Sequence, residues 1–206
     1  MSVPTTLFID TSIFDEAAYN FEAASIVAFR EAIEGIRLTL LMPDPTRREI
    51  RRHISEKSST IAKALAGAAH RAPFLRKLPD WPLNGVTLSV FQKKIEAIAN
   101  KELADFLKLF TVIDLSYEGL NLVEIMDWRD RWIAPFSEKK KAEFPDAFAI
   151  ASINQHHLNS PGNIAIISRD EDFRAICERY SHLQYFASLA GFSETLKLSL
   201  IHISEP

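Results

Sequence analysis

The chain has 206 residues, of which 47% are hydrophobic and 25% are charged, with a formal net charge of −3, and these values are typical of one soluble globular domain. A single cysteine excludes an internal disulfide, and no segment approaches the roughly 20 apolar residues of a membrane span. Because the N-terminus also has no basic and apolar leader, we expect a cytoplasmic protein.

The first predicted element is a strand within residues 7–14, which read LFIDTSIF. Residues 7–9 form a short apolar run that is typical of a strand buried on both faces, and Asp10 stands where this strand should end. Thr11 and Ser12 place two hydroxyl groups beside the carboxylate. Since ligands of open α/β sheets bind at the carboxyl ends of strands, Asp10 is well placed for chemistry, although an Asp here also suits a helix cap.

Alternating strands and helices follow. Apolar residues at helical spacing predict a helix over residues 15–34, which Gly35 ends, and residues 36–42 predict a second strand. A long helix should begin at Thr46, whose side chain suits an N-cap. The succession of strand, helix, strand and helix predicts a parallel sheet with right-handed crossovers.

The long helix and the segment after it are strongly basic. Residues 47–77 contain nine basic residues and two acids, Glu49 and Glu56. Two interpretations stay open, a solvated helix face and a surface that binds a polyanion. The basic residues are Arg47, Arg48, Arg51, Arg52, Lys57, Lys63, Arg71, Arg76 and Lys77, and the expected nucleic-acid contacts among them are Arg48, Arg51 and Arg52.

The middle of the chain, about residues 78–136, reads as a helical elaboration within a single domain. Its turn residues predict a connector over 78–85, and helical spacing predicts helices over 88–110 and 117–133. Residues 111–115 form a third candidate strand.

In the last third of the chain, strands and helices alternate again. A polar loop with three consecutive lysines, residues 137–143, precedes a helix over 144–158. An apolar strand over 163–168, a short helix over 174–180 and a strand over 183–186 follow. The final residues, 198–206, read LSLIHISEP and resemble one reading frame of a sequencing adapter, so we expect the native domain to span residues 1–197.

Acids recur at the expected strand ends and helix starts. In a parallel sheet these positions share one edge, so the carboxylates should converge there. Crowded carboxylates repel one another unless a cation neutralises them, and all-oxygen ligands suit Mg²⁺ or Mn²⁺. Two metals about 3.5–4 Å apart could activate water and stabilise the leaving oxygen of a phosphodiester. The four acids are Asp10, Glu49, Asp146 and Asp170.

These residues resemble a known family. LFIDTSIF, Glu49 after the second strand, PDAFAIASI at residues 145–153 and ISRDEDF at residues 167–173 are similar to the motifs of PIN domains. The resemblance implies a three-layer α/β/α sandwich with a mostly parallel central sheet, here with extra helices inserted. It also implies that Asp10, Glu49, Asp146 and Asp170 hold the metals, that Ser12 and Ser168 orient them by hydrogen bonds, that Asp172 is a helix N-cap or a further ligand, and that Glu143 is a reserve ligand.

By the same resemblance, the chain is expected to be an Mg²⁺- or Mn²⁺-dependent endoribonuclease that acts on single-stranded or structured RNA. It is longer than the compact toxins of the family and resembles larger bacterial PIN-like proteins. The sequence therefore leaves open a toxin or an RNA-processing role, and also whether an antitoxin or a second copy of the chain binds it.

Two other functions were weighed. A non-catalytic PIN-like module that binds nucleic acid or regulates would show a damaged acid set, whereas all four positions here are acidic. A phospho-receiver domain would need paired acids after the first strand and a lysine after a late strand. Asp114 could accept a phosphoryl group, but Asp10 has no adjacent acid, and Arg169 stands where the lysine is expected.

Overall fold

The structure is a computed structural model that describes residues 3–204, with side chains described for residues 3–199. It divides into two compact units. The α/β unit comprises residues 1–48 and 107–206, and the hairpin unit comprises residues 49–106. The segment interpreted as adapter sequence falls in the last helix, and its final two residues lie outside the described part of the chain.

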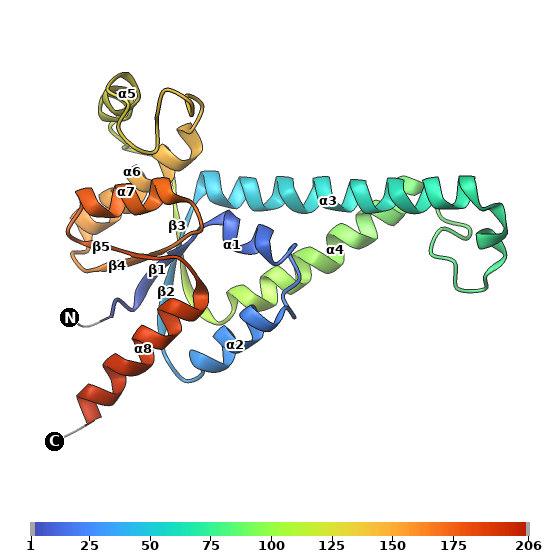
Figure 1. The fold of residues 1–206 in the computed structure, drawn as a ribbon, viewed down its shortest axis with the longest axis horizontal. Coiled ribbons are helices and arrows are strands. Elements are labelled where there is room, and N and C mark those ends of the chain that lie inside the picture. Colours follow the sequence, from blue (N-terminus) through green and yellow to red (C-terminus); the bar gives the residue numbers. More distant parts are fainter. Residues whose placement is uncertain (1–2, 205–206) are drawn as a thin grey trace. The chain divides into compact units, whose positions relative to one another are not determined.

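The α/β unit contains a five-stranded parallel sheet with the strand order β3-β2-β1-β4-β5 (Figure 1). The central strand β1 pairs with β2 on one side and with β4 on the other, where Ile9 lies opposite Ile167. All four residues of β4 are buried, as expected for an apolar run in a sheet that is covered on both faces. The strands are β1 (Thr6–Ile9), β2 (Leu38–Pro43), β3 (Phe110–Leu115), β4 (Ile164–Ile167) and β5 (Leu183–Phe186).

Helices cover both faces of this sheet, which confirms the predicted three-layer α/β/α fold. On one face Phe8 and Ile166 of the sheet share a buried cluster with Ile150 and Phe173. On the other face the ring of Phe192 lies 6.3 Å from that of Phe29 and 5.3 Å from that of Phe186. The first layer contains α5 (Leu122–Asp130), α6 (Phe144–Asn159) and α7 (Glu171–Arg179), and the second contains α2 (Ala24–Ala32) and α8 (Leu189–Ser204).

The prediction of one helix over residues 15–34 is wrong, because the chain turns sharply there. A short helix α1 (Thr11–Glu16) is separated from α2 by Ala18 and Tyr19, whose φ angles are 51° and 58°. The Tyr19 N–H donates to the Phe14 carbonyl at 2.8 Å, and the two rings pack 6.2 Å apart. Burial of aromatic side chains at this turn therefore overrides the helical spacing of the sequence.

Several helix boundaries also differ from the predictions: α7 (Glu171–Arg179) begins before residue 174, α4 (Leu88–Leu107) ends before residue 110, and two further differences have a clear local cause. Helix α3 (Asp44–Arg71) begins at Asp44 rather than at Thr46, because Pro45 fits the first turn of a helix. Helix α5 is shorter than the predicted 117–133. Gly119 has a φ of +76°, and Asn121 then caps the helix by accepting the N–H of Glu124 at 3.3 Å.

The hairpin unit consists of most of α3, a 3-10 segment η1 (Pro73–Lys77), a run of turns and α4 (Leu88–Leu107). Its two long helices are joined by a hydrogen bond of 2.8 Å from Ser55 Oγ to Glu96 Oε1, which also accepts from Gln92 Nε2. The predicted connector over residues 78–85 is confirmed as a non-helical segment. Within the described residues, no helix has both the length and the apolar character needed to cross a membrane.

Candidate active site

The strand order places the candidate site at the reversal point of the sheet. The chain leaves β1 toward β2 and β3 on one side, and then returns to β4 and β5 on the other. Ligands of open α/β sheets bind at such a reversal, outside the carboxyl ends of the strands. Asp10 directly follows β1, and Ser168 directly follows β4, so both lie at this position. The Asp10 N–H donates to the carbonyl of Ile167 at 2.9 Å and joins the two strand ends.

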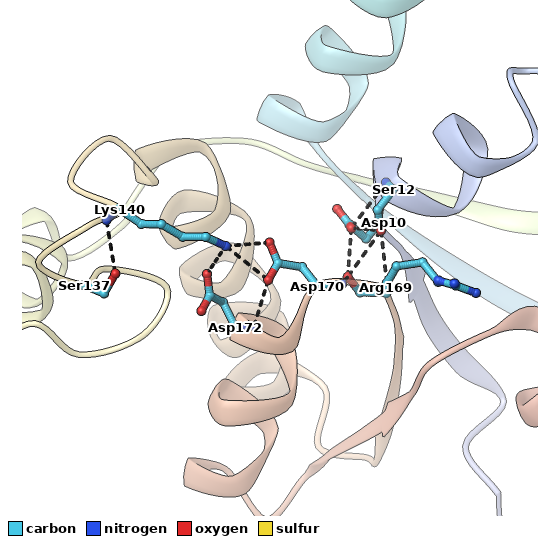
Figure 2. Close-up of polar contacts among 8 residues, drawn as sticks. Asp10, Ser12, Ser137, Lys140, Arg169, Asp170 and Asp172 are labelled. Carbon is cyan, nitrogen blue, oxygen red and sulfur yellow. Dashed lines mark hydrogen bonds and ion pairs between the residues drawn. The ribbon is translucent and has the colours of Figure 1, made fainter.

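Two serines, which follow the carboxyl ends of two neighbouring parallel strands, hold the Asp10 carboxylate. Ser168 Oγ donates to Asp10 Oδ2 at 2.8 Å, and Ser12 Oγ donates to the same oxygen at short distance. Asp10 also caps α1, because Oδ2 accepts the Ser12 N–H at 3.3 Å. Ser12 Oγ in turn accepts the N–H of Arg169 at 3.0 Å, so one hydroxyl connects the loops after β1 and β4. Figure 2 shows the hydrogen bonds around Asp10 and Ser12.

Asp10 is deeply buried, with 6% of its surface exposed. Burial raises the pKa of its carboxyl group, and the hydrogen bonds from Ser12 and Ser168 offset only part of that rise. A carboxyl group whose folded-state pKa is raised binds its proton more tightly in the folded chain. The stability of the fold is therefore greatest when Asp10 is protonated and falls as the pH rises through the folded-state pKa. A cation bound nearby would offset the free-energy cost of the buried negative charge on Asp10.

A second acidic group lies at the start of α7. Asp170 caps this helix by accepting the Asp172 N–H at 2.9 Å, so the cap is Asp170 and the interpretation of Asp172 as the cap is wrong. Ser168 Oγ accepts the Asp170 N–H at 3.0 Å. A single buried hydroxyl thus connects the Asp10 carboxylate to the backbone that positions Asp170.

Lys140 pairs with both acids of α7, an interaction that the sequence analysis missed. Its ammonium lies 3.0 Å from Asp170 Oδ2 and 2.5 Å from Asp172 Oδ2 (Figure 2). The hydrogen bond to Asp172, together with the charge of Asp170, holds the pKa of Lys140 above its usual range. A tight turn fixes the lysine, because its N–H donates to the Ser137 carbonyl at 3.1 Å. Lys140 and Asp170 are 30 residues apart in the sequence, so no local pattern links the two.

The remaining predicted acids stand on other helices. Asp146 lies in the first turn of α6 and is partly buried, and Glu143 occupies the N-cap position of that helix without a capping side-chain bond. Glu49 lies in the second turn of α3, where Arg52 contacts it at 3.1 Å and His53 at 3.8 Å. Glu49 belongs to the hairpin unit.

The predicted nucleic-acid contacts are all exposed residues of α3. The Arg48 guanidinium lies 5.6 Å from the centre of the Tyr117 ring, at a distance suited to a cation–π contact. Arg51 is exposed, and Arg52 divides its contacts between Glu49 and His53.

The donor chemistry at this edge fits a hard divalent cation. The carboxylates of Asp170 and Asp172 already converge on one positive charge, that of Lys140, and the buried Asp10 would gain from another. Among the described side chains, however, no three from His, Cys, Asp and Glu are gathered closely enough to hold a metal ion. A divalent ion that used Asp170 and Asp172 would therefore compete with the ammonium of Lys140.

Comparison with protein-family models places the sequence in a known class. The model described as PIN domain matches residues 7–173, which include β2, β3, β4 and all of β1 except Thr6. The chain therefore belongs to the PIN domain family, whose fold is of the nuclease type. Searches of curated proteins and of solved structures find no match. The family assignment removes the basis for the phospho-receiver alternative.

Proposed function

We propose that this protein is a metal-dependent nuclease that hydrolyses phosphodiester bonds in RNA. The observation that carries the proposal is the buried Asp10 carboxylate, which two serines hold at the reversal point of the sheet beside Asp170. Mg²⁺ or Mn²⁺ bound there would supply an activated water molecule and would stabilise charge on the leaving oxygen. Asp10, Asp170 and Asp172, with Asp146 as the family resemblance implies, are the residues that would hold it, once side-chain movement brings them closer than they lie in this structure.

The chain's own groups each have a defined part in this proposal. Ser12 and Ser168 donate to one oxygen of Asp10 and so fix the direction of the other. Because these donors are built into the fold, Asp10 needs no reorganisation when a substrate arrives. Asp170 is oriented through its backbone by Ser168, and the exposed arginines of α3 supply positive charge for phosphates.

The test is a cleavage panel. Structured RNA, single-stranded RNA and single-stranded DNA of matched sequence are incubated with the protein in Mn²⁺, in Mg²⁺ and in excess chelator. The proposal predicts internal cuts in RNA that require the metal and that are weaker or absent on DNA. Cleavage that persists in chelator would overturn the metal dependence, and equal cleavage of DNA would overturn the choice of substrate.

One observation favours a non-catalytic module as the second candidate. Lys140 neutralises Asp170 and Asp172, and a permanently filled acid pair would leave no place for a metal. The same panel separates the two candidates, because a non-catalytic module would bind the RNA and leave it intact under every condition.

A further inference from the structure

The end of the hairpin unit presents large apolar side chains to solvent. Phe74, within η1, is 67% exposed, and Leu78 beside it is 51% exposed. Trp81 is partly buried and lines a hollow of about 380 Å³ together with Arg76 and Asn84. We call residues 71–85 the tip. Phe74 and Leu78 together present apolar surface close in the chain to the hollow beside Trp81, and contiguous apolar surface is a feature of ligand-binding sites.

Basic residues are frequent in the sequence of the tip. The tip contains Arg71, Arg76 and Lys77 and a single acid, Asp80. The whole hairpin unit has ten Lys and Arg residues against six Asp and Glu, although the chain as a whole has a formal charge of −3. The basic excess is thus concentrated in the unit that bears the exposed rings. Aromatic faces interleaved with cations are the combination that binds single-stranded nucleic acid.

Local hydrogen bonds connect the successive turns of the tip. Backbone N–H groups of Leu75, Leu78, Trp81 and Asn84 each donate to the carbonyl three residues earlier, at 3.0–3.1 Å. The Asn84 side chain closes the run by donating to the Leu78 carbonyl at 3.0 Å. Prolines at positions 73, 79 and 82 restrict the backbone further. A ligand that binds here meets a surface that is already arranged, so little conformational entropy is lost on binding.

We propose that the tip is a binding site for single-stranded nucleic acid, in which bases stack on Phe74 and Trp81 while Arg76 and Lys77 contact phosphates. This inference deepens the proposed function, since it assigns a second contact for the same substrate. Every nucleobase has an aromatic face, so the site should accept many sequences.

Charge and geometry favour nucleic acid over other partners. A protein partner for an apolar surface would need no cluster of cations. An anionic membrane would attract the cations, but the hollow beside Trp81 includes the amide of Asn84 and the guanidinium of Arg76, which suit a base edge and a phosphate. Membrane binding is nevertheless included as an outcome of the test.

The test measures binding without cleavage. Fluorescence anisotropy of a labelled oligouridylate of about 20 nucleotides is followed in excess chelator, at several salt concentrations, with the full-length protein. Because Phe74 is exposed, its substitution leaves folding intact. Three variants separate stacking on an aromatic ring from general apolar contact. Phe74→Ala should weaken binding about tenfold, Phe74→Leu should weaken it nearly as much although it stays apolar, and Phe74→Trp should restore it.

The phosphate contacts have a separate readout. The double variant Arg76→Gln/Lys77→Gln should flatten the slope of log K against log salt by about 1.4, since each lost phosphate contact on a single strand removes about 0.7. Matched controls lie in the α/β unit, where Arg37→Gln and Lys197→Gln remove exposed cations and Leu158→Ala removes a side chain that is 78% exposed. The controls should leave the affinity and the slope unchanged.

Each outcome decides the matter. Equal affinity of Phe74→Leu and wild type would overturn stacking, and an unchanged salt slope would overturn the phosphate contacts. Binding to vesicles of phosphatidylserine and phosphatidylcholine without binding to the oligonucleotide would overturn the choice of ligand. If the tip variants lose RNA binding but wild type never cleaves RNA, the tip inference stands and the proposed function fails. If wild type cleaves RNA but the tip variants bind normally, the proposed function stands and the tip inference fails.

Discussion

Ser168 is the residue on which the geometry of the candidate site depends most. It has no exposed surface, its hydroxyl donates to Asp10 Oδ2, and it accepts the Asp170 N–H. One side chain therefore satisfies a buried carboxylate and fixes the backbone of a second acid. Loss of such a hydroxyl leaves two buried polar groups short of a partner, which is more costly than the loss of one bond at the surface.

Ser168→Ala should lower the free energy of unfolding by about 1–3 kcal/mol, since the Asp170 N–H and the Asp10 carboxylate both lose a partner. Ser152→Ala is the matched control. Ser152 is equally small and also buried, but its hydroxyl donates only to the Ala149 carbonyl within the same helix. Denaturant unfolding of both variants checks the prediction, and equal losses would show that the Ser168 network adds nothing.

Lys140 should oppose metal binding, because its ammonium occupies the cation position between Asp170 and Asp172. Lys140→Met keeps the length of the side chain and removes the charge. Since a partly exposed ion pair is worth about 1 kcal/mol or less, Mn²⁺ affinity should rise up to about fivefold. The metal-free protein should be slightly less stable, as the two carboxylates then repel each other.

Calorimetric titration with Mn²⁺ measures this effect, and Lys139→Met provides the control with a neighbouring lysine that is exposed. Unchanged or weaker affinity in Lys140→Met alone would show that the metal binds elsewhere.

The sequence could not reveal the pairing of Lys140 with Asp170 and Asp172, because a loop lysine carries no pattern that tells which of several acids it will meet. Asp10, by contrast, was predictable from its place after an apolar run.

At the scale of elements, strands were predicted well and helix ends less well. The strand predicted over residues 163–168 contains β4, because the fully buried run IAII is typical of a strand inside a parallel sheet. Helix ends depend on one or two side chains. The break between α1 and α2 arises from tertiary packing of Phe14, Tyr19 and Phe21, which helical spacing alone does not show.

That break leaves strain that a glycine would relieve. Ala18 is exposed and has a φ of 51°, in a region that disfavours side chains with a Cβ. Ala18→Gly should therefore raise the free energy of unfolding by about 0.5–1 kcal/mol, which is about 2 °C in the thermal midpoint. Ala17→Gly is the control. Its φ is −77°, so glycine there relieves no strain and should lower stability. A loss of stability in both variants would contradict the inferred backbone strain at Ala18.

For the whole molecule, the distribution of charge matters more than the total. The hairpin unit has a basic excess of four, whereas the rest of the chain has 14 basic residues against 21 acids. The formal charge of −3 conceals this separation. The basic stretch is visible in the sequence, and the predicted contacts Arg48, Arg51 and Arg52 lie at the start of α3, whereas the exposure of Phe74 is not evident from residue spacing.

The central claim is that Asp10 belongs to a metal-dependent cleavage site, and one comparison tests it most directly. Single-turnover RNA cleavage in Mn²⁺ and the thermal midpoint in chelator are measured for wild type, for Asp10→Asn and for Asp130→Asn, an exposed acid of α5. Asp10→Asn should retain or raise the metal-free midpoint, because a desolvated charge is removed, and should lower cleavage by orders of magnitude. Asp130→Asn should match wild type in both. If Asp10→Asn cleaves RNA as fast as wild type, the account of the site is contradicted.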